Sequence, residues 1–347
     1  MSDSPLHVTP SERPPGRESP GSLRYLVTGG GGFIGRHLIG RLEAIGAQVH
    51  ATTRAQPPST PSVGWWRVDL ADPAATQRLV HQVRPDVLVH LASRAEGTRA
   101  LDVVVPMLYD NLLSTVNIMT AATAVAGCRV VLAGSVEEAG AAPDGVGPHS
   151  PYAASKVAAT TYAALFRDLW RLPVVVLRLA HVYGPAEPNT HRLLPYVINS
   201  LLDEVAPALS GGTRRIDWVY IDDVVDALVA AAVEPGALGK VIDIGSGTLV
   251  SIREIVSMVA AAIGADVEPG FGRQPDRARE RDLVADPGLA HRALGWRPRI
   301  GLRTGIERTV AWHLALRAAE SGPRSPFPER GATPHAPFPL ARSHSSG

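Results

Sequence analysis

The sequence predicts an α/β protein: a Rossmann-like, doubly wound parallel sheet carrying a smaller, mixed α/β substrate-binding cap toward the C-terminus. Short apolar runs alternate with segments of helical spacing from residue 24 to residue 180, which is typical of a parallel sheet with crossover helices. A glycine-rich turn joins the first run to the first helix. After Gly184 the alternation loosens into helices, short strands and loops rich in proline and glycine, which predicts the cap.

The predicted strands are apolar runs of the length expected for strands that are buried on both faces. They comprise residues 24–28, 48–53, 65–69, 86–91, 129–133 and 173–180. Apolar residues at helical spacing predict helices at 33–45, 73–83, 106–126, 151–169, 190–203, 222–233, 251–263 and 302–318.

These elements divide the chain into two domains and two tails. Residues 23–183 are predicted to form the dinucleotide-binding domain, to which residues 220–248 return. Residues 184–219 and 249–318 are predicted to form the cap. The two ends, 1–22 and 319–347, combine proline, serine and charged residues with little apolar periodicity, which predicts disordered tails.

Composition excludes several classes of function. The 347-residue chain is 45% apolar and has a net charge of +1, so nothing in its charge favours nucleic acid or an acidic membrane surface as a partner. Cys128 is the one cysteine, which excludes an intramolecular disulfide and a multi-cysteine metal site, and no metal is expected. No apolar run reaches the roughly 18 residues of a membrane-spanning helix, and no signal-peptide core precedes the first strand. These features favour a cytoplasmic protein.

The stretch "YLVTGGGGFIGRHL" carries the first binding motif. Gly29, Gly32 and Gly35 have the spacing G-x-x-G-x-x-G between a predicted strand and a predicted helix. In that context the first glycine permits a tight turn, the second lets the backbone approach a pyrophosphate, and the third lets the helix pack against the strand. The turn therefore predicts a dinucleotide site.

The end of the second strand bears on the choice of cofactor. NAD-binding folds often place a carboxylate about 20 residues after the glycines, where it binds the ribose 2′-hydroxyl. This chain has Thr53 and Arg54 there instead. Because a guanidinium pairs with a 2′-phosphate, Arg54 favours NADP(H), with NAD(H) as the alternative. Asp69 and Leu70 are candidates for the adenine side of the site, and Leu91 and Ala92 for apolar contacts with the cofactor.

Ser135, Tyr152 and Lys156 form a candidate catalytic group. Tyr152 and Lys156 in "SPYAASK" are four residues apart, so a helix places them on one face, where the ammonium is expected to lower the pKa of the phenol. Ser135 ends the fifth predicted strand in "VVLAGSVEEAG" and could hold a substrate oxygen.

The glycine turn, the strand-end serine and Tyr-x-x-x-Lys, in this order, resemble the extended short-chain dehydrogenase/reductase family, and the resemblance covers residues 23 to about 318. Further matches are "VDLAD" at 68–72, "HLAS" at 90–93, "DNLLSTVNIM" at 110–119, "LRLAHVYGP" at 177–185, "RRIDWVYIDDVVDAL" at 214–228 and "LGWRP" at 294–298. Members of this family act mostly on nucleotide-linked sugars.

The resemblance implies a role for each matching residue. Tyr152 is implied to be the general acid/base, Lys156 to bind the nicotinamide ribose, and Ser135 to hold the reacting oxygen. The implied pyrophosphate cradle comprises Gly29, Gly32, Phe33, Ile34 and Gly35, and Asn111 supports the active site and cofactor from its helix. Arg215 and Arg277 are implied to grip the sugar nucleotide's diphosphate. His181, which stands where many relatives have asparagine, either contacts substrate or packs in the core.

"GSVEEAG" is most similar to reductases of 4-keto-6-deoxy sugar nucleotides, in which Glu137 could hydrogen-bond the sugar or act as a base beside a carbonyl. The predicted function is therefore reduction of a keto group, first of all at C4, on a nucleotide-diphosphate-linked deoxysugar. The alternatives are an epimerase with tightly bound NAD, a decarboxylase, or a dehydratase, against which Val136 argues because valine cannot protonate a leaving hydroxyl. A non-enzymatic dinucleotide-binding sensor is the alternative from another class. The family also implies a homodimer that forms through the helices at 106–126 and 151–169.

Overall fold

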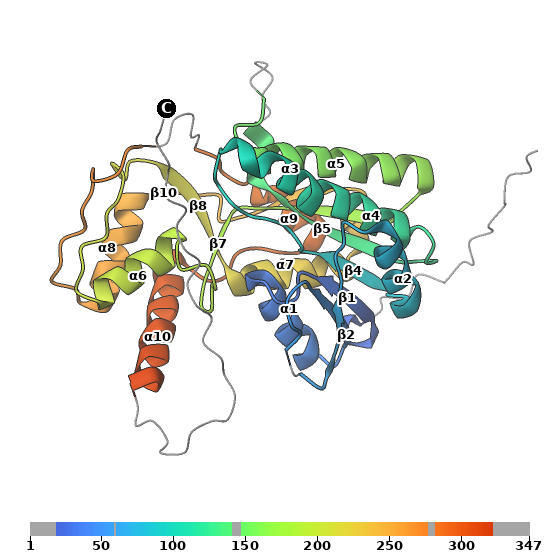
Figure 1. Ribbon diagram of the computed structural model, residues 1–347, viewed down its shortest axis with the longest axis horizontal. Coiled ribbons are helices and arrows are strands. Elements are labelled where there is room, and N and C mark those ends of the chain that lie inside the picture. Colours follow the sequence, from blue (N-terminus) through green and yellow to red (C-terminus); the bar gives the residue numbers. More distant parts are fainter. Residues whose placement is uncertain (1–18, 59, 141–146, 277–281, 322–347) are drawn as a thin grey trace, which may run out of the picture.

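The computed structural model describes residues 19–58, 60–140, 147–276 and 282–321, and its larger part is built on a seven-stranded sheet (Figure 1). The strand order is β3-β2-β1-β4-β5-β6-β9, and every neighbouring pair is parallel. The strands are β1 (Arg24–Thr28), β2 (Gln48–Thr53), β3 (Val63–Arg67), β4 (Val87–His90), β5 (Arg129–Ser135), β6 (Val174–Leu179) and β9 (Val241–Ile244). The predicted Rossmann-like sheet is confirmed.

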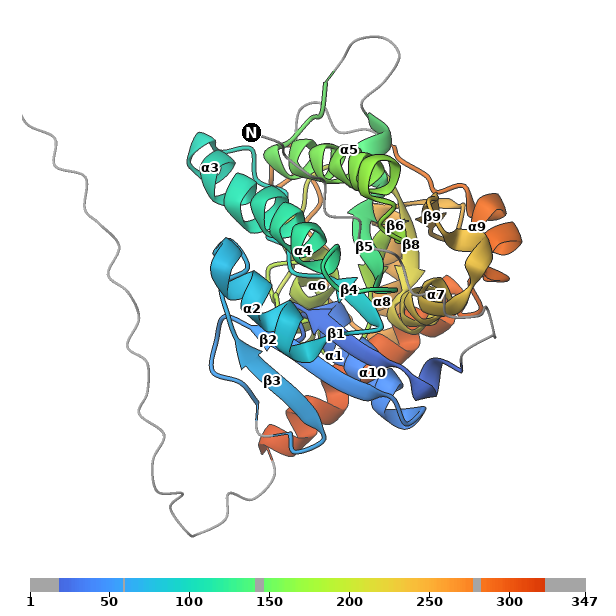
Figure 2. The ribbon, with the colours of Figure 1, turned by 90° about the vertical axis from the view of Figure 1, so that its right-hand side faces the viewer.

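Helices cover both faces of this sheet (Figures 1 and 2). One face carries α1 (Phe33–Ala44) and α7 (Ile221–Val233), and the other carries α2 (Pro73–Val83), α4 (Ser114–Ala122) and α5 (Pro151–Trp170). Side chains of β1 alternate between two hydrophobic clusters: Tyr25 and Val27 belong to one, and Leu26 belongs to the other. This alternation explains why the strands read as continuous apolar runs, since both faces are buried.

The cap is a separate layer beside the carboxyl ends of the large sheet (Figure 1). It contains a three-stranded sheet in the order β10-β8-β7, formed by β7 (His181–Tyr183), β8 (Arg215–Tyr220) and β10 (Leu249–Ser251). The cap helices are α6 (Leu193–Leu202), α8 (Ile252–Ile263) and α10 (Leu302–Ser321). Thus β7 lies in the cap sheet, whereas α7 and β9 join the large sheet; the proposed domain boundaries remain a prediction.

The structure differs from the predicted elements in a few places. The helix expected at 106–126 is divided into α3 (Val104–Met107), a π-helical segment η3 (Leu108–Leu113) and α4. The third strand begins two residues earlier than predicted, at Val63 rather than residue 65. Sequence reasoning missed α9 (Pro287–Leu294), which has only 8 residues.

Parts of both predicted tails belong to the folded chain. A short 3-10 helix, η1, spans Pro20–Ser22, and α10 continues to Ser321, past the predicted boundary at 318. The predictions for 1–18 and 322–347 fall outside the described residues. Among the residues that the structure describes, no helix is both long and apolar enough to cross a membrane.

Candidate active site

The glycine-rich turn between β1 and α1 adopts a backbone conformation that requires its glycines. Gly29 has a φ of +68°, and a Cβ at this position would lie 2.8 Å from the backbone nitrogen of Ala92. A Cβ on Gly35 would collide with the carbonyl oxygen of Gly29. Gly32 is the N-cap of α1 and has no side chain with which to cap the first turn. The N–H groups of that turn can therefore bind an anionic ligand.

A cavity of about 370 Å³ lies beside this turn. Seven of the residues predicted to bind the cofactor line it, namely Gly29, Gly32, Arg54, Asp69, Leu70, Leu91 and Ala92. Phe33, Ile34 and Gly35 are in the first turn of α1, outside this lining, and Phe33 is buried. A glycine cradle, an uncapped helix N-terminus and a wall of mixed polarity fit the adenosine diphosphate part of an NAD(P) cofactor.

The three predicted catalytic side chains come together at the carboxyl end of β5. Ser135 is the last residue of β5, and Tyr152 and Lys156 are on successive turns at the start of α5. The side chains of Ser135 and Tyr152 are hydrogen-bonded to each other. The Nζ atom of Lys156 lies 5.7 Å from the centroid of the Tyr152 ring and donates a hydrogen bond to the Ala133 carbonyl oxygen (2.7 Å).

The expectation that Lys156 makes the phenol more acidic is not met. The pKa of Tyr152 is raised, first by burial and then by the negative charge of Glu137, while the hydrogen bond with Ser135 and the charge of Arg192 oppose the shift. Burial also lowers the pKa of Lys156 to about 8, against the charge of Glu138. Burial and the Glu137 charge therefore favour the protonated form of the Tyr152 phenol.

Glu137 lies in the turn after β5, close enough to Tyr152 for its charge to affect the phenol. Its backbone N–H donates to the Ser135 hydroxyl at 3.2 Å. Its carboxylate contacts Nε2 of His149 at 3.3 Å, while the buried Nδ1 of His149 has no hydrogen-bond partner among the described residues. A carboxylate and an imidazole therefore meet next to the hydroxyls of Ser135 and Tyr152.

Asn111 is buried in the π-helical segment η3, and its amide is fully used within the protein. It accepts a hydrogen bond from the backbone N–H of Arg94 (2.7 Å) and donates to the carbonyl oxygen of Arg94 (3.1 Å) and to the hydroxyl of Ser155 (2.9 Å). Asn111 thus ties the loop after β4 to α5 and does not line the cavity. π-Helical segments are frequent at functional sites, which agrees with its position here.

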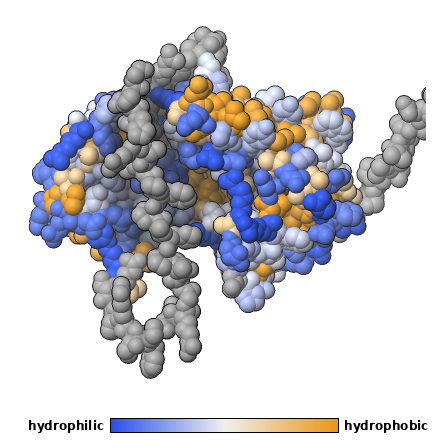
Figure 3. All heavy atoms as spheres, in the orientation of Figure 1, coloured by the Kyte–Doolittle hydropathy of each residue, from blue (hydrophilic) through white to orange (hydrophobic). Residues whose placement is uncertain are grey.

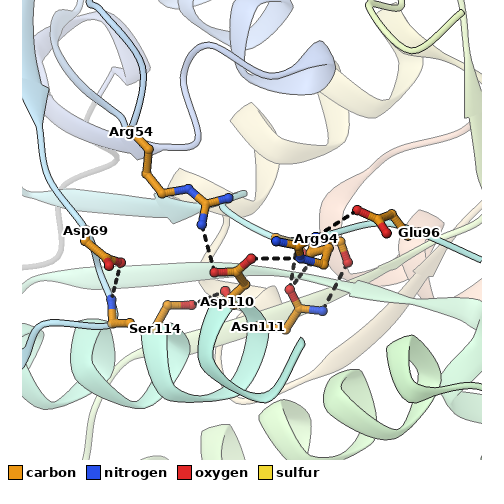
Figure 4. A network of polar contacts seen from close by, with 9 residues as sticks. Arg54, Asp69, Arg94, Glu96, Asp110, Asn111 and Ser114 are labelled. Carbon is orange, nitrogen blue, oxygen red and sulfur yellow. Dashed lines mark hydrogen bonds and ion pairs between the residues drawn. The ribbon is translucent and has the colours of Figure 1, made fainter. Parts of the chain in front are cut away.

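Arg54 reaches from the end of β2 across the cavity to the residue before Asn111 (Figure 4). Its guanidinium pairs with Oδ1 of Asp110 at 2.8 Å, and the other oxygen of Asp110 accepts from Nε of Arg94 at 2.9 Å. Arg94 also pairs with Glu96 at 3.1 Å. Asp69, at the other side of the cavity, accepts a hydrogen bond from the N–H of Ala71 (3.0 Å).

On the cap side, His181 packs edge-on against Trp218, with ring centroids 4.5 Å apart. Burial, with the charges of Arg192 and Arg214, lowers the pKa of His181 to about 3, so its ring is neutral. His181, Trp218 and Arg192 line a small hollow, in which Arg192 also pairs with Glu187 at 2.9 Å.

Of the two arginines predicted to bind the diphosphate of a sugar nucleotide, the structure describes only Arg215. Arg215 begins β8, and its Nε pairs with Asp282 at 2.8 Å. Its side chain is half-exposed, so a ligand phosphate would have to compete with that carboxylate. Arg277 lies outside the described residues.

A model of the NAD dependent epimerase/dehydratase family matches residues 25–245 of this chain. The chain belongs to this family. This confirms the predicted membership of the extended short-chain dehydrogenase/reductases, an enzyme family whose members use a nicotinamide cofactor.

Three similar proteins show the range of activities within the epimerase/dehydratase family. The UDP-glucose 4-epimerase of Mycolicibacterium smegmatis is 31% identical over 310 residues, which cover 83% of this chain and 97% of that protein. A dTDP-glucose 4,6-dehydratase of an Actinoplanes species is 27% identical, with 85% and 99% covered. The solved structure of MoeE5 in complex with UDP-glucuronic acid and NAD is 31% identical and has a TM-score of 0.75, with 84% of this chain and 99% of that chain covered.

Several residues near the site of this epimerase/dehydratase family member were missed by sequence reasoning. Asp110 and His149 reach it from loops or helix segments far from their partners in sequence, so no local pattern identifies them. For Arg192 the sequence offers only its position immediately before the helix α6, in "HRLLPY", and this does not identify a site residue. The two glutamates of "GSVEEAG" cannot be distinguished by their sequence, and the burial of Glu138 becomes evident only in the fold.

Proposed function

We propose that this chain interconverts nucleotide-diphosphate sugars by reversible oxidation at a ring carbon that carries a hydroxyl, C4 being the first choice, and that it acts as an epimerase. The observation that supports this most is the hydrogen-bonded pair of Ser135 and Tyr152, which lies at the carboxyl end of the sheet with Lys156 one turn away. The 4-epimerase activity named for the 31% identical relative supports the same reaction.

In this proposal the chain's own residues hold and move one proton. Ser135 hydrogen-bonds the sugar oxygen, and Tyr152, which enters this step as the phenolate, takes the proton of that oxygen as the ketone forms and returns it as the hydroxyl forms again. The bound nicotinamide supplies the acceptor and donor of the hydride. Lys156 orients the nicotinamide ribose from within the same helix.

Dehydration has less support, because Val136 occupies the position after Ser135 and cannot protonate a leaving hydroxyl. Keto reduction, the function predicted first from the sequence, is the second candidate. It is favoured by the raised pKa of Tyr152, since a phenol that keeps its proton is the form that protonates an alkoxide.

Although the epimerase alternative implied by the sequence carries NAD, we propose NADP(H) as the preferred cofactor of this chain. Two guanidinium side chains, Arg36 and Arg54, line the cavity, and the end of β2 provides no carboxylate that would repel a 2′-phosphate. The sugar nucleotide would lie toward the cap, where His181, Arg192 and Arg215 are candidates for its sugar and phosphate groups.

We also propose that the protein forms a homodimer through α3, η3 and α5. Six hydrophobic residues of these neighbouring segments are at least 40% exposed. Val105, Leu108 and Tyr109 belong to α3 and η3, and Leu165, Leu169 and Trp170 belong to α5. Hydrophobic residues gather on the surface in this region (Figure 3). A second copy would bury this apolar face in a four-helix arrangement.

The test is to incubate the protein with UDP-glucose or dTDP-glucose and either NAD⁺ or NADP⁺, and to identify the product by NMR. An epimerase yields the C4 epimer with no net change in reduced cofactor. A ketoreductase leaves these sugars unchanged and consumes NADPH when a 4-keto-6-deoxy sugar nucleotide is supplied. A dehydratase forms that keto sugar itself, which would overturn the epimerase assignment.

A further inference from the structure

The Arg54–Asp110 ion pair spans the cavity that we assign to the cofactor, and it brings together residues 56 positions apart in the chain (Figure 4). Both residues line the cavity. A guanidinium that is expected to bind a 2′-phosphate is thus already bound to a carboxylate of the protein. Any 2′-phosphate that reaches Arg54 has to displace Asp110 from it or share it.

The two members of the pair are held to different extents. The side chain of Arg54 is 63% exposed, whereas that of Asp110 is 15% exposed. Asp110 also has a second cationic partner, because its other oxygen accepts a hydrogen bond from Arg94. If Arg54 swings away, Asp110 keeps Arg94 and is not left as an unpaired buried charge, which is the costly outcome for an ion pair.

The helix segment that carries Asp110 is itself fixed. The hydroxyl of Ser114 donates to the carbonyl oxygen of Asp110 at 2.6 Å, and the adjacent Asn111 is bonded to the loop after β4 and to α5. Arg54 is therefore the member of the pair that is free to change partner, whereas Asp110 is held in place.

From these observations we infer that Asp110 is a cofactor-selecting residue: it competes with a 2′-phosphate for Arg54 and so reduces the preference of the site for 2′-phosphorylated cofactors. With NADP(H), Arg54 exchanges the carboxylate for the more highly charged phosphate. With NAD(H), Arg54 stays on Asp110. The site thereby accepts both cofactors with less discrimination than Arg54 alone would give. This inference rests on the proposed function only in assigning the cavity to the adenosine half of the cofactor.

The experiment uses 2′,5′-ADP and 5′-AMP as probes, which differ only in the 2′-phosphate, and measures their dissociation constants by calorimetry for the full chain. For Asp110→Asn we expect 2′,5′-ADP to bind roughly three- to tenfold more tightly, the range for loss of one competing ion pair, and 5′-AMP to change less than about twofold. Arg54→Ala should weaken 2′,5′-ADP by at least about tenfold and leave 5′-AMP nearly unchanged. Glu96→Gln is the matched control, because Glu96 pairs with Arg94 and not with Arg54.

A double-mutant cycle separates competition from simple repulsion. In the Arg54→Ala background, Asp110→Asn should no longer improve 2′,5′-ADP binding if competition for Arg54 is the cause. An undiminished improvement there would mean that Asp110 only repels the phosphate, and would overturn the inference. Equal weakening of both probes by Asp110→Asn would also overturn it, since it would show that the pair supports adenosine. A wild-type chain that binds neither probe would overturn the cofactor assignment itself, together with the inference.

Discussion

The carboxylate of Glu138 accepts a hydrogen bond from the backbone N–H of Ser135 at 2.7 Å, and its other oxygen accepts one from the hydroxyl of Thr160 at 2.7 Å. Glu138 is 7% exposed and thus connects the end of β5 to α5, the two elements that carry Ser135 and Tyr152. A Cβ on Gly134 would lie 2.5 Å from this carboxylate, so the glycine before Ser135 makes room for it.

Replacing Glu138 should therefore change both stability and turnover. In Glu138→Ala the buried N–H of Ser135 loses its acceptor, and we expect a loss of about 1–3 kcal/mol in the free energy of unfolding and a lower kcat. Glu138→Gln can still accept from Ser135 and donate to Thr160, so it should retain most of both. Urea denaturation and steady-state kinetics measure the two effects. Equal behaviour of the alanine and glutamine variants would contradict this role.

Lys156 should make stability depend on pH. Its pKa in the folded protein is lowered to about 8 from the ordinary 10.5, so between these values the unfolded chain binds a proton that the folded chain has released. Stability contributed by this group therefore rises with pH across that window, by up to about 3 kcal/mol if the whole shift is expressed. Because tyrosine and Cys128 ionise to different extents in the folded and unfolded chain above about pH 9, the measurement is the difference in unfolding free energy between wild type and Lys156→Met from pH 7 to 9, over which about 1.4 kcal/mol of the rise is expected. A flat difference would show that Lys156 is not desolvated.

Asp217 should be a structural carboxylate of the cap. It is 1% exposed and accepts hydrogen bonds from the N–H groups of Ser246 (2.8 Å), Gly247 (3.0 Å) and Ala285 (3.0 Å). Asp217→Asn turns an amide N–H₂ toward these donors, and should lower the free energy of unfolding by about 2–4 kcal/mol. The control is Asp222→Asn, an exposed aspartate, for which chemical denaturation should give a change within about 0.5 kcal/mol.

The proposed dimer predicts a change of mass in solution. A charge placed at Leu165, which is 40% exposed on α5, should separate the copies and halve the mass measured by light scattering toward the 36.7 kDa of one chain. Leu314→Glu on α10 is the matched control, since Leu314 is 45% exposed but lies on the cap. A wild-type chain that is already a monomer at micromolar concentration would contradict the proposal.

Apolar patterns predicted the sheet and its helices because the central strands β1, β4, β5 and β6 are buried on both faces, and caps that the patterns did not use stand at several helix ends. Ser150, for example, accepts a hydrogen bond from the N–H of Ala153 at 3.0 Å and begins α5 where the pattern places it. The missed helix α9 also has caps, Asp286 and Gly295, but its 8 residues are too few for periodicity to be decisive.

Within the site, the sequence could predict residue types but not their partners. The order of Ser135, Tyr152 and Lys156 placed all three correctly at one end of the sheet, because chain topology fixes that edge. The predicted lowering of the Tyr152 pKa was wrong, because burial of the phenol and the nearby charge of Glu137 raise it. The contact between Arg54 and Asp110 joins distant segments and no periodic pattern encodes it.

The role of Tyr152 as the proton-transferring group is tested most directly by turnover of Tyr152→Phe, with the dissociation constant of NADP(H) measured on the same preparation. The phenylalanine keeps the ring and removes only the hydroxyl that meets Ser135. We predict cofactor binding within about twofold of wild type and a kcat for the converted sugar nucleotide that falls about 100- to 10,000-fold. An unchanged kcat in this variant would contradict the account.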